Sequence, residues 1–304
     1  MRKLARFLIF ISFLLIGSGV LLNYQIDVKR AYEEAKKHAP IEAQNSYVRK
    51  DDYNFVKNVD NAYPNNYQEL LNTIFSIINN GYDEFTFFCG NEYSTCLKDL
   101  DTLGKDQETL STINNYVHPF NTFENVKIHY NDEGKIKLEF DKYYKEEDIV
   151  LVNTKVDTLY TSLVNSSFDD KTNIKVIHDY IINNTKYDSK RAHENILDYK
   201  SNIAYGTLLE GYAVCGGYSD AMAIFLDRMG IKNFKVASAD HVWNALELDG
   251  VWYNLDLTWD DPVVSDGSDY LDDSYFLIST DRLLQLDTSQ HTFNIENYTE
   301  LKSS

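Results

Sequence analysis

The chain has 304 residues, of which 43% are hydrophobic and 14% aromatic, with only 13 Gly and 4 Pro. This composition excludes a disordered tail and a low-complexity polymer, and the length predicts about two domains. The 29 Lys and Arg against 47 Asp and Glu give a net charge of −18, so the mean field repels phosphates and we expect no nucleic-acid partner.

The first residues, 1–24, predict an export segment. Three cationic side chains within residues 1–6 precede an uncharged, apolar run over 7–22. The nineteen residues from Leu4 to Leu22 are long enough, at ~1.5 Å per residue, to cross a ~30 Å hydrocarbon core, and no typical cleavage site follows them. We expect an uncleaved signal anchor that holds the protein at the cell membrane with its body outside. The alternative is a long, cleaved signal peptide and a secreted protein.

Hydropathy patterns divide the rest of the chain into a stalk and two domains. Residues 25–62 begin with charged side chains at helical spacing, which is typical of a solvated stalk. Mixed periodicity then predicts a small α+β domain over 63–150. Its predicted elements are a helix over 67–78 and strands over 85–88, 126–130 and 136–140, the last two joined by a turn at 132–134. An amphipathic helix over 144–164 leads into a second domain, 151–304.

The three cysteines bear on the compartment and on the chemistry. Cys89 and Cys96 flank the turn-forming residues Gly90 and Asn91, so a disulfide is possible in an exported chain. The alternative is two ordinary buried thiols, because spacing alone does not fix geometry. Cys215 is then left over, and a reactive nucleophile is one explanation for an unpaired thiol in an exported protein.

Cys215 opens a predicted helix over 215–229, which Gly230 ends. At a helix N-terminus, unpaired backbone N–H groups and the helix dipole stabilise a thiolate. Gly216 and Gly217 would let a substrate backbone approach closely. The alternative is a small buried thiol that caps a core helix.

A predicted hairpin supplies two further groups of the right chemistry. Asp249-Gly250 favours a two-residue turn, which pairs Leu248 with Val251. In that register His241 and Asp256 are diagonal neighbours on one face, and the other face is the predicted core side. A thiolate that attacks an amide carbon, an imidazole that moves the proton and a carboxylate that orients the imidazole form a cysteine triad.

Six short stretches together resemble the transglutaminase-like superfamily of papain-type cysteine enzymes, over about residues 172–279. They are Ile177-His-Asp-Tyr180, Lys186-Tyr-Asp188, Ala204-Tyr-Gly-Thr-Leu208, Ala213-Val-Cys-Gly-Gly-Tyr218, His241-Val-Trp-Asn244 and Trp252-Tyr-Asn-Leu-Asp-Leu-Thr-Trp-Asp-Asp-Pro262. The resemblance implies an α+β fold in which the nucleophile helix packs on an antiparallel sheet. It also implies Cys215 as nucleophile, His241 as general base and acid, and Asp256 as orienter.

The resemblance also suggests which groups surround the reaction. The Cys215 N–H is a natural oxyanion donor. Further oxyanion or substrate-binding candidates are Tyr205, Tyr212, Gly216 and Trp243. Bacterial relatives often carry a larger polar residue at the position of Gly216, which bears on substrate specificity.

Other polar residues are interpreted as structural. The acidic residues between 260 and 273 do not have the spacing of a helix-loop-helix calcium site and predict a solvated loop; they are Asp260, Asp261, Asp266, Asp269, Asp272 and Asp273. His178 is predicted to be a partly buried helix histidine. His118, His129, His193 and His291 have no nearby Cys or His at metal-ligand spacing. We predict no metal and no cofactor.

The resulting hypothesis is cysteine-dependent acyl transfer on peptide or protein amides through a thioester, ending in hydrolysis or transamidation. The expected partner is a peptide or protein substrate, with cell-wall peptide as one candidate. The alternative is a non-catalytic surface module that binds protein or cell-wall peptide.

Overall fold

The computed structural model describes residues 24–261 and 272–303. The predicted export segment, 1–24, lies outside the described residues except for Tyr24. Within the described part of the chain, no helix combines the length and the apolar character needed to cross a membrane.

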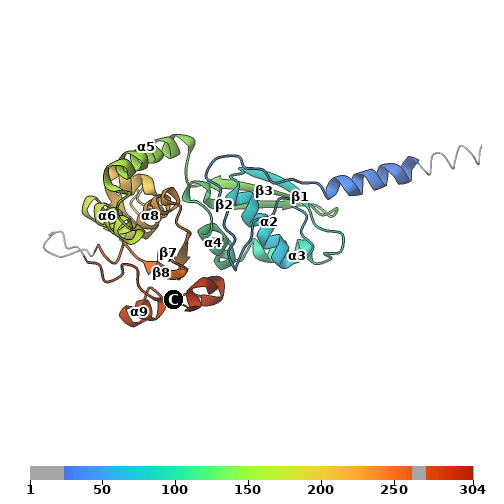
Figure 1. Ribbon diagram of the computed structural model, residues 1–304. Helices are drawn as coiled ribbons and strands as arrows, with labels where there is room; N and C mark the ends of the chain where they lie inside the picture. The colour runs from blue at the N-terminus through green and yellow to red at the C-terminus, as the bar shows by residue number, and fades with distance from the viewer. Residues whose placement is uncertain (1–23, 262–271, 304) are drawn as a thin grey trace, which may run out of the picture.

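The N-terminal part contains a three-stranded antiparallel sheet covered by helices. Strands β1 (Glu84–Phe88), β2 (Phe123–Tyr130) and β3 (Lys135–Lys142) lie in the order β1-β3-β2. Helices α2 (Tyr67–Asn79), α3 (Cys96–Leu103) and α4 (Gln107–Asn115) lie beside this sheet (Figure 1). The predicted helix and the three predicted strands are confirmed, whereas α3 and α4 had no expected counterpart.

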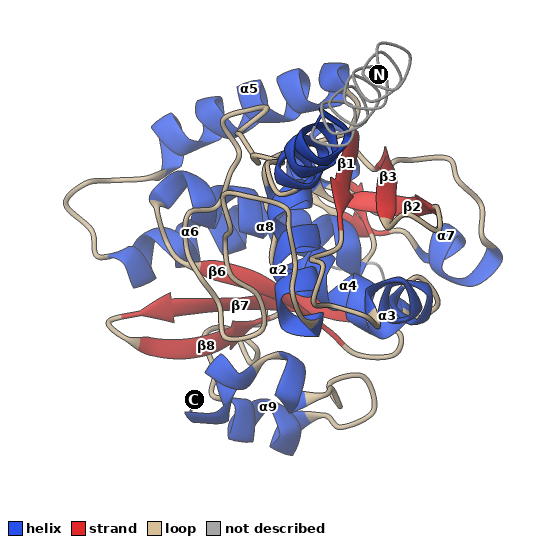
Figure 2. Cartoon of the chain, turned by 90° about the vertical axis from the view of Figure 1, so that its right-hand side faces the viewer, coloured by secondary structure: helices blue, strands red, loops and turns tan. Residues whose placement is uncertain are grey.

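The C-terminal part contains a second antiparallel sheet with a helical layer on one face. Strands β6 (Asn233–Ala237), β7 (Val242–Leu248) and β8 (Val251–Leu255) lie in that order. Helix α8 (Cys215–Met229) packs on this sheet, and α5 (Glu146–Leu163) and α6 (Asp170–Asn184) lie against α8 (Figure 2). The smaller elements are η1 (Pro119–Asn121), β4 (Lys186–Tyr187), α7 (Ser189–Glu194), η2 (Gly206–Glu210), β5 (Tyr212–Ala213), α9 (Thr280–Leu286), η3 (Ile295–Asn297) and η4 (Thr299–Ser303).

The hairpin between β7 and β8 has the predicted register. Asp249 and Gly250 both adopt positive φ, 52° and 77°, as a two-residue turn that matches strand twist requires. The pairs run from Leu248 opposite Val251 to Asn244 opposite Leu255. The turn chemistry of two residues therefore fixes where the following side chains lie.

Both faces of this hairpin are buried, not only the predicted core face. On the α8 side, Leu246 and Leu255 belong to one hydrophobic cluster. On the other side, Trp243 and Ala245 belong to a cluster that continues into the N-terminal sheet and α2. The chain segments after β8 and helix α4 cover this second face, which local periodicity could not foresee. The domain boundaries at 62 and 150 remain a prediction.

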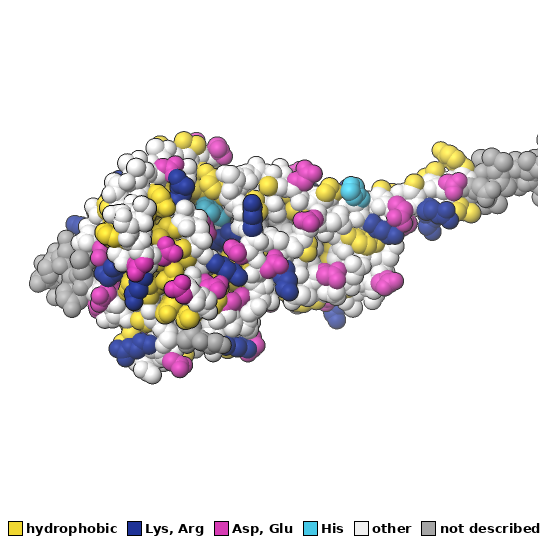
Figure 3. Space-filling model, viewed as in Figure 1, with side chains coloured by type: hydrophobic (Ala, Val, Ile, Leu, Met, Phe, Trp, Pro, Cys, Tyr) yellow, Lys and Arg dark blue, Asp and Glu magenta, His cyan; other side chains and the backbone are white. Residues whose placement is uncertain are grey.

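The predicted stalk, 25–62, has two different parts in the structure. Residues 24–36 form a largely exposed helix that projects from the body with charges of both signs (Figure 3). Further along, Tyr53, Val56 and Ala62 are buried in the core of the N-terminal part. The solvated-stalk interpretation is therefore wrong for the second part, because its apolar side chains are irregularly spaced yet pack against α2 and its neighbours.

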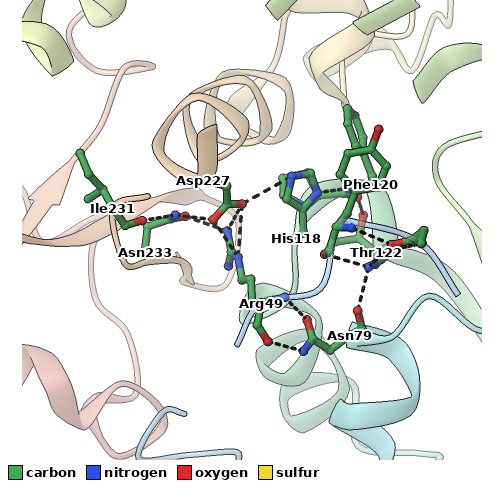
Figure 4. A network of polar contacts seen from close by, with 12 residues as sticks. Arg49, Asn79, His118, Phe120, Thr122, Asp227, Ile231 and Asn233 are labelled. Atoms are coloured by element: carbon green, nitrogen blue, oxygen red, sulfur yellow. Dashed lines mark hydrogen bonds and ion pairs between the residues drawn. The ribbon is translucent and has the colours of Figure 1, made fainter. Parts of the chain in front are cut away.

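A buried polar network joins this segment to helix α8 (Figure 4). The Arg49 side chain is 5% exposed, and its Nη2 lies 2.9 Å from Asp227 Oδ2 on α8. Arg49 also donates to Asn233 Oδ1 at 2.8 Å and to the Tyr116 carbonyl at 3.2 Å. The Nε2 of His118 lies 3.6 Å from Asp227, and burial lowers the pKa of His118 to about 4, so this ring is neutral at pH 7.

Candidate active site

Cys215 is the first residue of α8 and follows Val214, whose backbone is extended. The N–H groups of Gly217 and Tyr218 bond the Val214 carbonyl at 2.9 and 3.2 Å. Cys215 and Gly216 occupy the first two helical positions, whose N–H groups have no intrahelical partner. The thiol therefore sits where a helix stabilises an anion, as the sequence predicts.

Position 216 has room only for glycine, because the backbone of Asn202 passes close to it. A Cβ at this position would lie 2.8 Å from the Asn202 carbonyl oxygen. The larger polar residue of bacterial relatives would therefore need a shift of the backbone near Asn202. The backbone near Asn202 therefore lies beside position 216, next to the nucleophile, and leaves no room for a side chain there.

His241 precedes β7, Asp256 follows β8, and the predicted contact between them is present. His241 Nε2 lies 2.6 Å from Asp256 Oδ2, with the His241 side chain 3% exposed and that of Asp256 1% exposed. The Cys215 thiol lies close enough to His241 to raise the pKa of the ring. Because Nε2 faces Asp256, Nδ1 is the nitrogen left for the thiol.

The electrostatic surroundings favour a charged imidazole in this pair. Burial lowers the pKa of His241, but the charge and hydrogen bond of Asp256, together with those of Cys215, outweigh burial and raise this pKa to about 10. Burial raises the pKa of Asp256, while the charge of His241 and hydrogen bonds from His241 and His291 hold it well below its usual range. The site can therefore hold an imidazolium between a carboxylate and a thiolate.

The carboxylate of Asp256 accepts four hydrogen bonds. Its Oδ1 accepts from the N–H groups of Thr258 at 2.9 Å and Trp259 at 3.2 Å. Its Oδ2 accepts from His241 and also from His291 Nε2, at 2.9 Å. Sequence reasoning missed His291, because it lies 35 residues beyond Asp256 and outside any motif.

The three remaining candidate residues, Tyr205, Tyr212 and Trp243, take different places. The Tyr205 ring lies 4.4 Å from Lys200 Nζ, and the Tyr212 ring stacks on Tyr199 at 4.0 Å, so neither ring contact involves Cys215. Trp243 is 1% exposed, which excludes direct contact with a substrate in this structure. It stacks on His241 at 5.7 Å instead, and its Nε1 donates to Asn254 Oδ1 at 2.9 Å. Trp243 therefore supports the histidine.

Tyr187 is a further aromatic residue close to the thiol. Burial raises the pKa of its hydroxyl, and so do the charges of Cys215 and Asp188. Strand β4, which carries Tyr187, pairs in parallel with β5, which leads into Cys215. The motif Lys186-Tyr-Asp188 gave the signal for Tyr187, although no role was assigned to it from the sequence.

The predicted solvated acidic loop is wrong for its first residue. Asp260 is fully buried, and its Oδ2 lies 3.1 Å from Nε2 of His178, which is also fully buried. Burial raises the pKa of Asp260. Tyr218 of α8 donates to Asp261. These contacts join three of the motifs that carry the resemblance; Asp266 and Asp269 lie outside the described residues.

Among the described residues, His241, Asp256 and His291 have ligand atoms within 4.8 Å of one another, a spacing that could hold a metal ion. All three are buried and already paired by hydrogen bonds. A metal would have to replace those bonds, so the absence of a metal stays our prediction.

The other two cysteines form the disulfide that the sequence allowed. Cys89 and Cys96 are bonded with their Cα atoms 6.1 Å apart, and Cys215 is free. The disulfide joins the end of β1 to the start of α3, within the N-terminal part.

No family model and no curated protein matches the chain. Among solved structures, the chain is similar to the crystal structure of a TGase, with 15% identity and a TM-score of 0.31, over 45% of this chain and 45% of that one. It is also similar to a putative cysteine protease from Cytophaga hutchinsonii, with 13% identity and a TM-score of 0.28, over 48% of this chain and 65% of that one. The matches thus span less than two thirds of either neighbour.

Proposed function

We propose that the protein is a cysteine-dependent acyl-transfer enzyme that acts on peptide or protein amides at the cell surface. The observation that carries the proposal is the position of His241, which bonds Asp256 at 2.6 Å through Nε2 and lies close enough to Cys215 for the thiol to raise the pKa of the ring. A buried His–Asp pair beside a half-buried cysteine at a helix N-terminus supplies the groups that nucleophilic catalysis by a thiol requires.

Each group of the site has its own role in the proposed reaction. The Cys215 thiolate attacks the amide carbonyl carbon, and the oxyanion that forms can accept from the N–H groups at the start of α8. The His241 imidazolium gives its proton to the departing amine as the C–N bond breaks, which leaves a thioester on Cys215. Water or a second amine then attacks the thioester, His241 takes the proton from it, and the thiolate is regenerated.

Two observations support an exported location for this chemistry. Residues 1–24 have the pattern of a signal anchor. Cys89 and Cys96 form a disulfide, and disulfides persist mainly in oxidising compartments. The expected substrate class is a peptide or protein outside the cell, with cell-wall peptide as one candidate.

The test is the rate at which iodoacetamide alkylates Cys215 as a function of pH. Because the pKa of His241 is raised to about 10, the imidazolium that stabilises the thiolate persists throughout the neutral range. Alkylation should therefore continue well below pH 8.5, where an ordinary thiol loses its thiolate, and should stop only when acid protonates the thiolate. His241→Ala should restore an ordinary thiol profile, lowering the rate at pH 6 by about a hundredfold.

His129→Ala is the matched control, because His129 is an exposed histidine on β2, and it should leave the profile unchanged. An ordinary thiol profile in the unmodified protein would contradict catalysis and favour the non-catalytic binding module.

Removal of metal ions should leave the same reaction unaffected. The three residues with metal-ligand spacing are held by hydrogen bonds in the proposed enzyme, so we expect dialysis against EDTA to change the alkylation rate at pH 7 by less than about twofold. A rate that rises strongly after EDTA and falls again with added Zn²⁺ would contradict the metal-free site.

A further inference from the structure

A second buried histidine contacts the carboxylate of the proposed triad. The His291 side chain is fully buried, and its Nε2 lies 2.9 Å from Asp256 Oδ2, the oxygen that also accepts from His241. The other nitrogen of His291, Nδ1, lies 3.0 Å from Asp287 Oδ2. Carboxylates only accept, so both contacts are hydrogen bonds at once only when both ring nitrogens carry hydrogen.

Aromatic rings fix the orientation of His291. It stacks on Tyr275 with ring centres 5.4 Å apart and 21° between planes. It meets the ring of Trp243 at 5.0 Å and 71°, and that of Trp259 at 5.4 Å. The titratable groups that face it are therefore Asp256, Asp287, Tyr275 and His241, whose ring lies 5.3 Å away at 89°. An enclosed ring with both nitrogens engaged has little freedom to turn.

This arrangement gives Oδ2 of Asp256 a second, immobile donor. Two backbone N–H groups hold Oδ1, and without His291 the only described partner of Oδ2 would be His241. Together with the two backbone donors, the bond from His291 fixes the orientation of the carboxylate. Hydrogen bonds to a catalytic group from residues that do not contact the substrate commonly determine how well that group is oriented.

We propose that His291 is a positioning residue: by donating to Asp256 Oδ2, it holds the carboxylate against His241 Nε2 and so keeps His241 Nδ1 directed at Cys215. The effect on Cys215 rests on the proposed function, whereas the effect on the orientation of His241 does not. The segment after α9, which no motif marks, thereby becomes part of the site.

Two amide substitutions separate the two contacts of His291. In His291→Gln the amide nitrogen takes the place of Nε2 and can still donate to Asp256. In His291→Asn the amide nitrogen takes the place of Nδ1 and can reach only Asp287. We expect alkylation of Cys215 at pH 6 to be about tenfold slower in the Asn variant and within about threefold of the unmodified protein in the Gln variant. At pH 9 the three rates should converge, because an ordinary thiol ionises there.

A second measurement reports on His241 directly. In protein labelled with ¹⁵N-histidine, the proton that His241 Nε2 shares with Asp256 should give a downfield NMR signal. That signal should persist in the Gln variant and be lost in the Asn variant, while urea unfolding shows that both variants are folded.

The outcomes are distinct. Unmodified signals and rates in the Asn variant would overturn the proposal, and so would equal losses in both variants at both pH values, which indicate a merely structural role. If Cys215 is inert in the unmodified protein but the NMR signal disappears only in the Asn variant, the positioning of His241 stands and the proposed function fails.

Discussion

Replacing Asp256 with alanine is expected to have the largest effect of any single change in the site. Asp256 is 1% exposed and accepts hydrogen bonds from two backbone N–H groups and two histidines. Its loss leaves those donors buried without partners, which should lower the free energy of unfolding by ~3–5 kcal/mol. Urea unfolding at pH 6 measures this loss. Alkylation of Cys215 at the same pH should fall at least as far as in His241→Ala.

Asp256→Asn is the matched control for orientation. Asparagine keeps the size of the side chain, and its carbonyl oxygen can still accept from Thr258 and Trp259. Its amide nitrogen, however, presents a donor to His241 and His291 where the carboxylate accepted. We expect most of the stability to return and the reactivity to stay low, because His241 is then held in the wrong tautomer. Full reactivity in the Asn variant would contradict the role of Asp256 as orienter.

The stability difference between Asp256→Ala and the unmodified protein should depend on pH in a defined way. The pKa of Asp256 is lowered on folding, so its contribution is present above the unfolded value of about 3.9 and lost as the pH falls through the folded value. The pKa of His241 is raised to about 10, so its contribution is complete below about 6.5 and lost as the pH rises toward 10. The difference should therefore be largest between about pH 4 and pH 6.5.

The inner part of the site could be predicted from the sequence because local chemistry positions it. The turn at Asp249-Gly250 sets the register of β7 and β8, and the register places His241 beside Asp256. Gly230 adopts a positive φ of 73° and ends α8, as the sequence predicts, so the helix that begins at Cys215 was identified by its apolar spacing and its stop. Each of these inferences depends on residues a few positions apart.

The outer part of the site could not be predicted because it is assembled by contacts between distant segments. His291 reaches Asp256 across 35 positions, and His178 reaches Asp260 across 82. The residues next to either histidine in the sequence do not indicate which carboxylate that histidine contacts. For the same reason Trp243 was interpreted as a residue that contacts substrate, since nothing local shows that the chain after β8 buries it.

The contact between Arg49 and α8 also joins distant segments, so the sequence could not predict it. Breaking this contact is the second change for which we expect a large effect. The Arg49 guanidinium is 5% exposed and bonds Asp227 through Nη2 at 2.9 Å and through Nε at 3.1 Å. Asp227→Ala removes the partner of a buried charge, which should lower the free energy of unfolding by about 3 kcal/mol. The measurement is urea unfolding at pH 7, where burial keeps His118 neutral, so His118 adds no second positive charge beside the unpaired Arg49.

Asp157→Ala provides the matched control, because Asp157 also pairs with an arginine but at the surface. The Arg228 and Asp157 side chains are 52% and 49% exposed, and their atoms lie 3.0 Å apart. Water and salt screen this pair, so its loss should cost no more than about 0.5 kcal/mol. Equal losses in the two variants would contradict the buried-charge argument.

The Arg49 link should affect stability without changing the chemistry. Asp227 lies near the C-terminal end of α8 and Cys215 at its start, twelve residues apart along the helix, or about 18 Å at ~1.5 Å per residue. A folded Asp227→Ala protein should therefore alkylate Cys215 with the unmodified pH profile. A changed profile would mean that α8 transmits a displacement from its packing against Arg49 to the thiol, and that the N-terminal part helps to set the reactivity of the site.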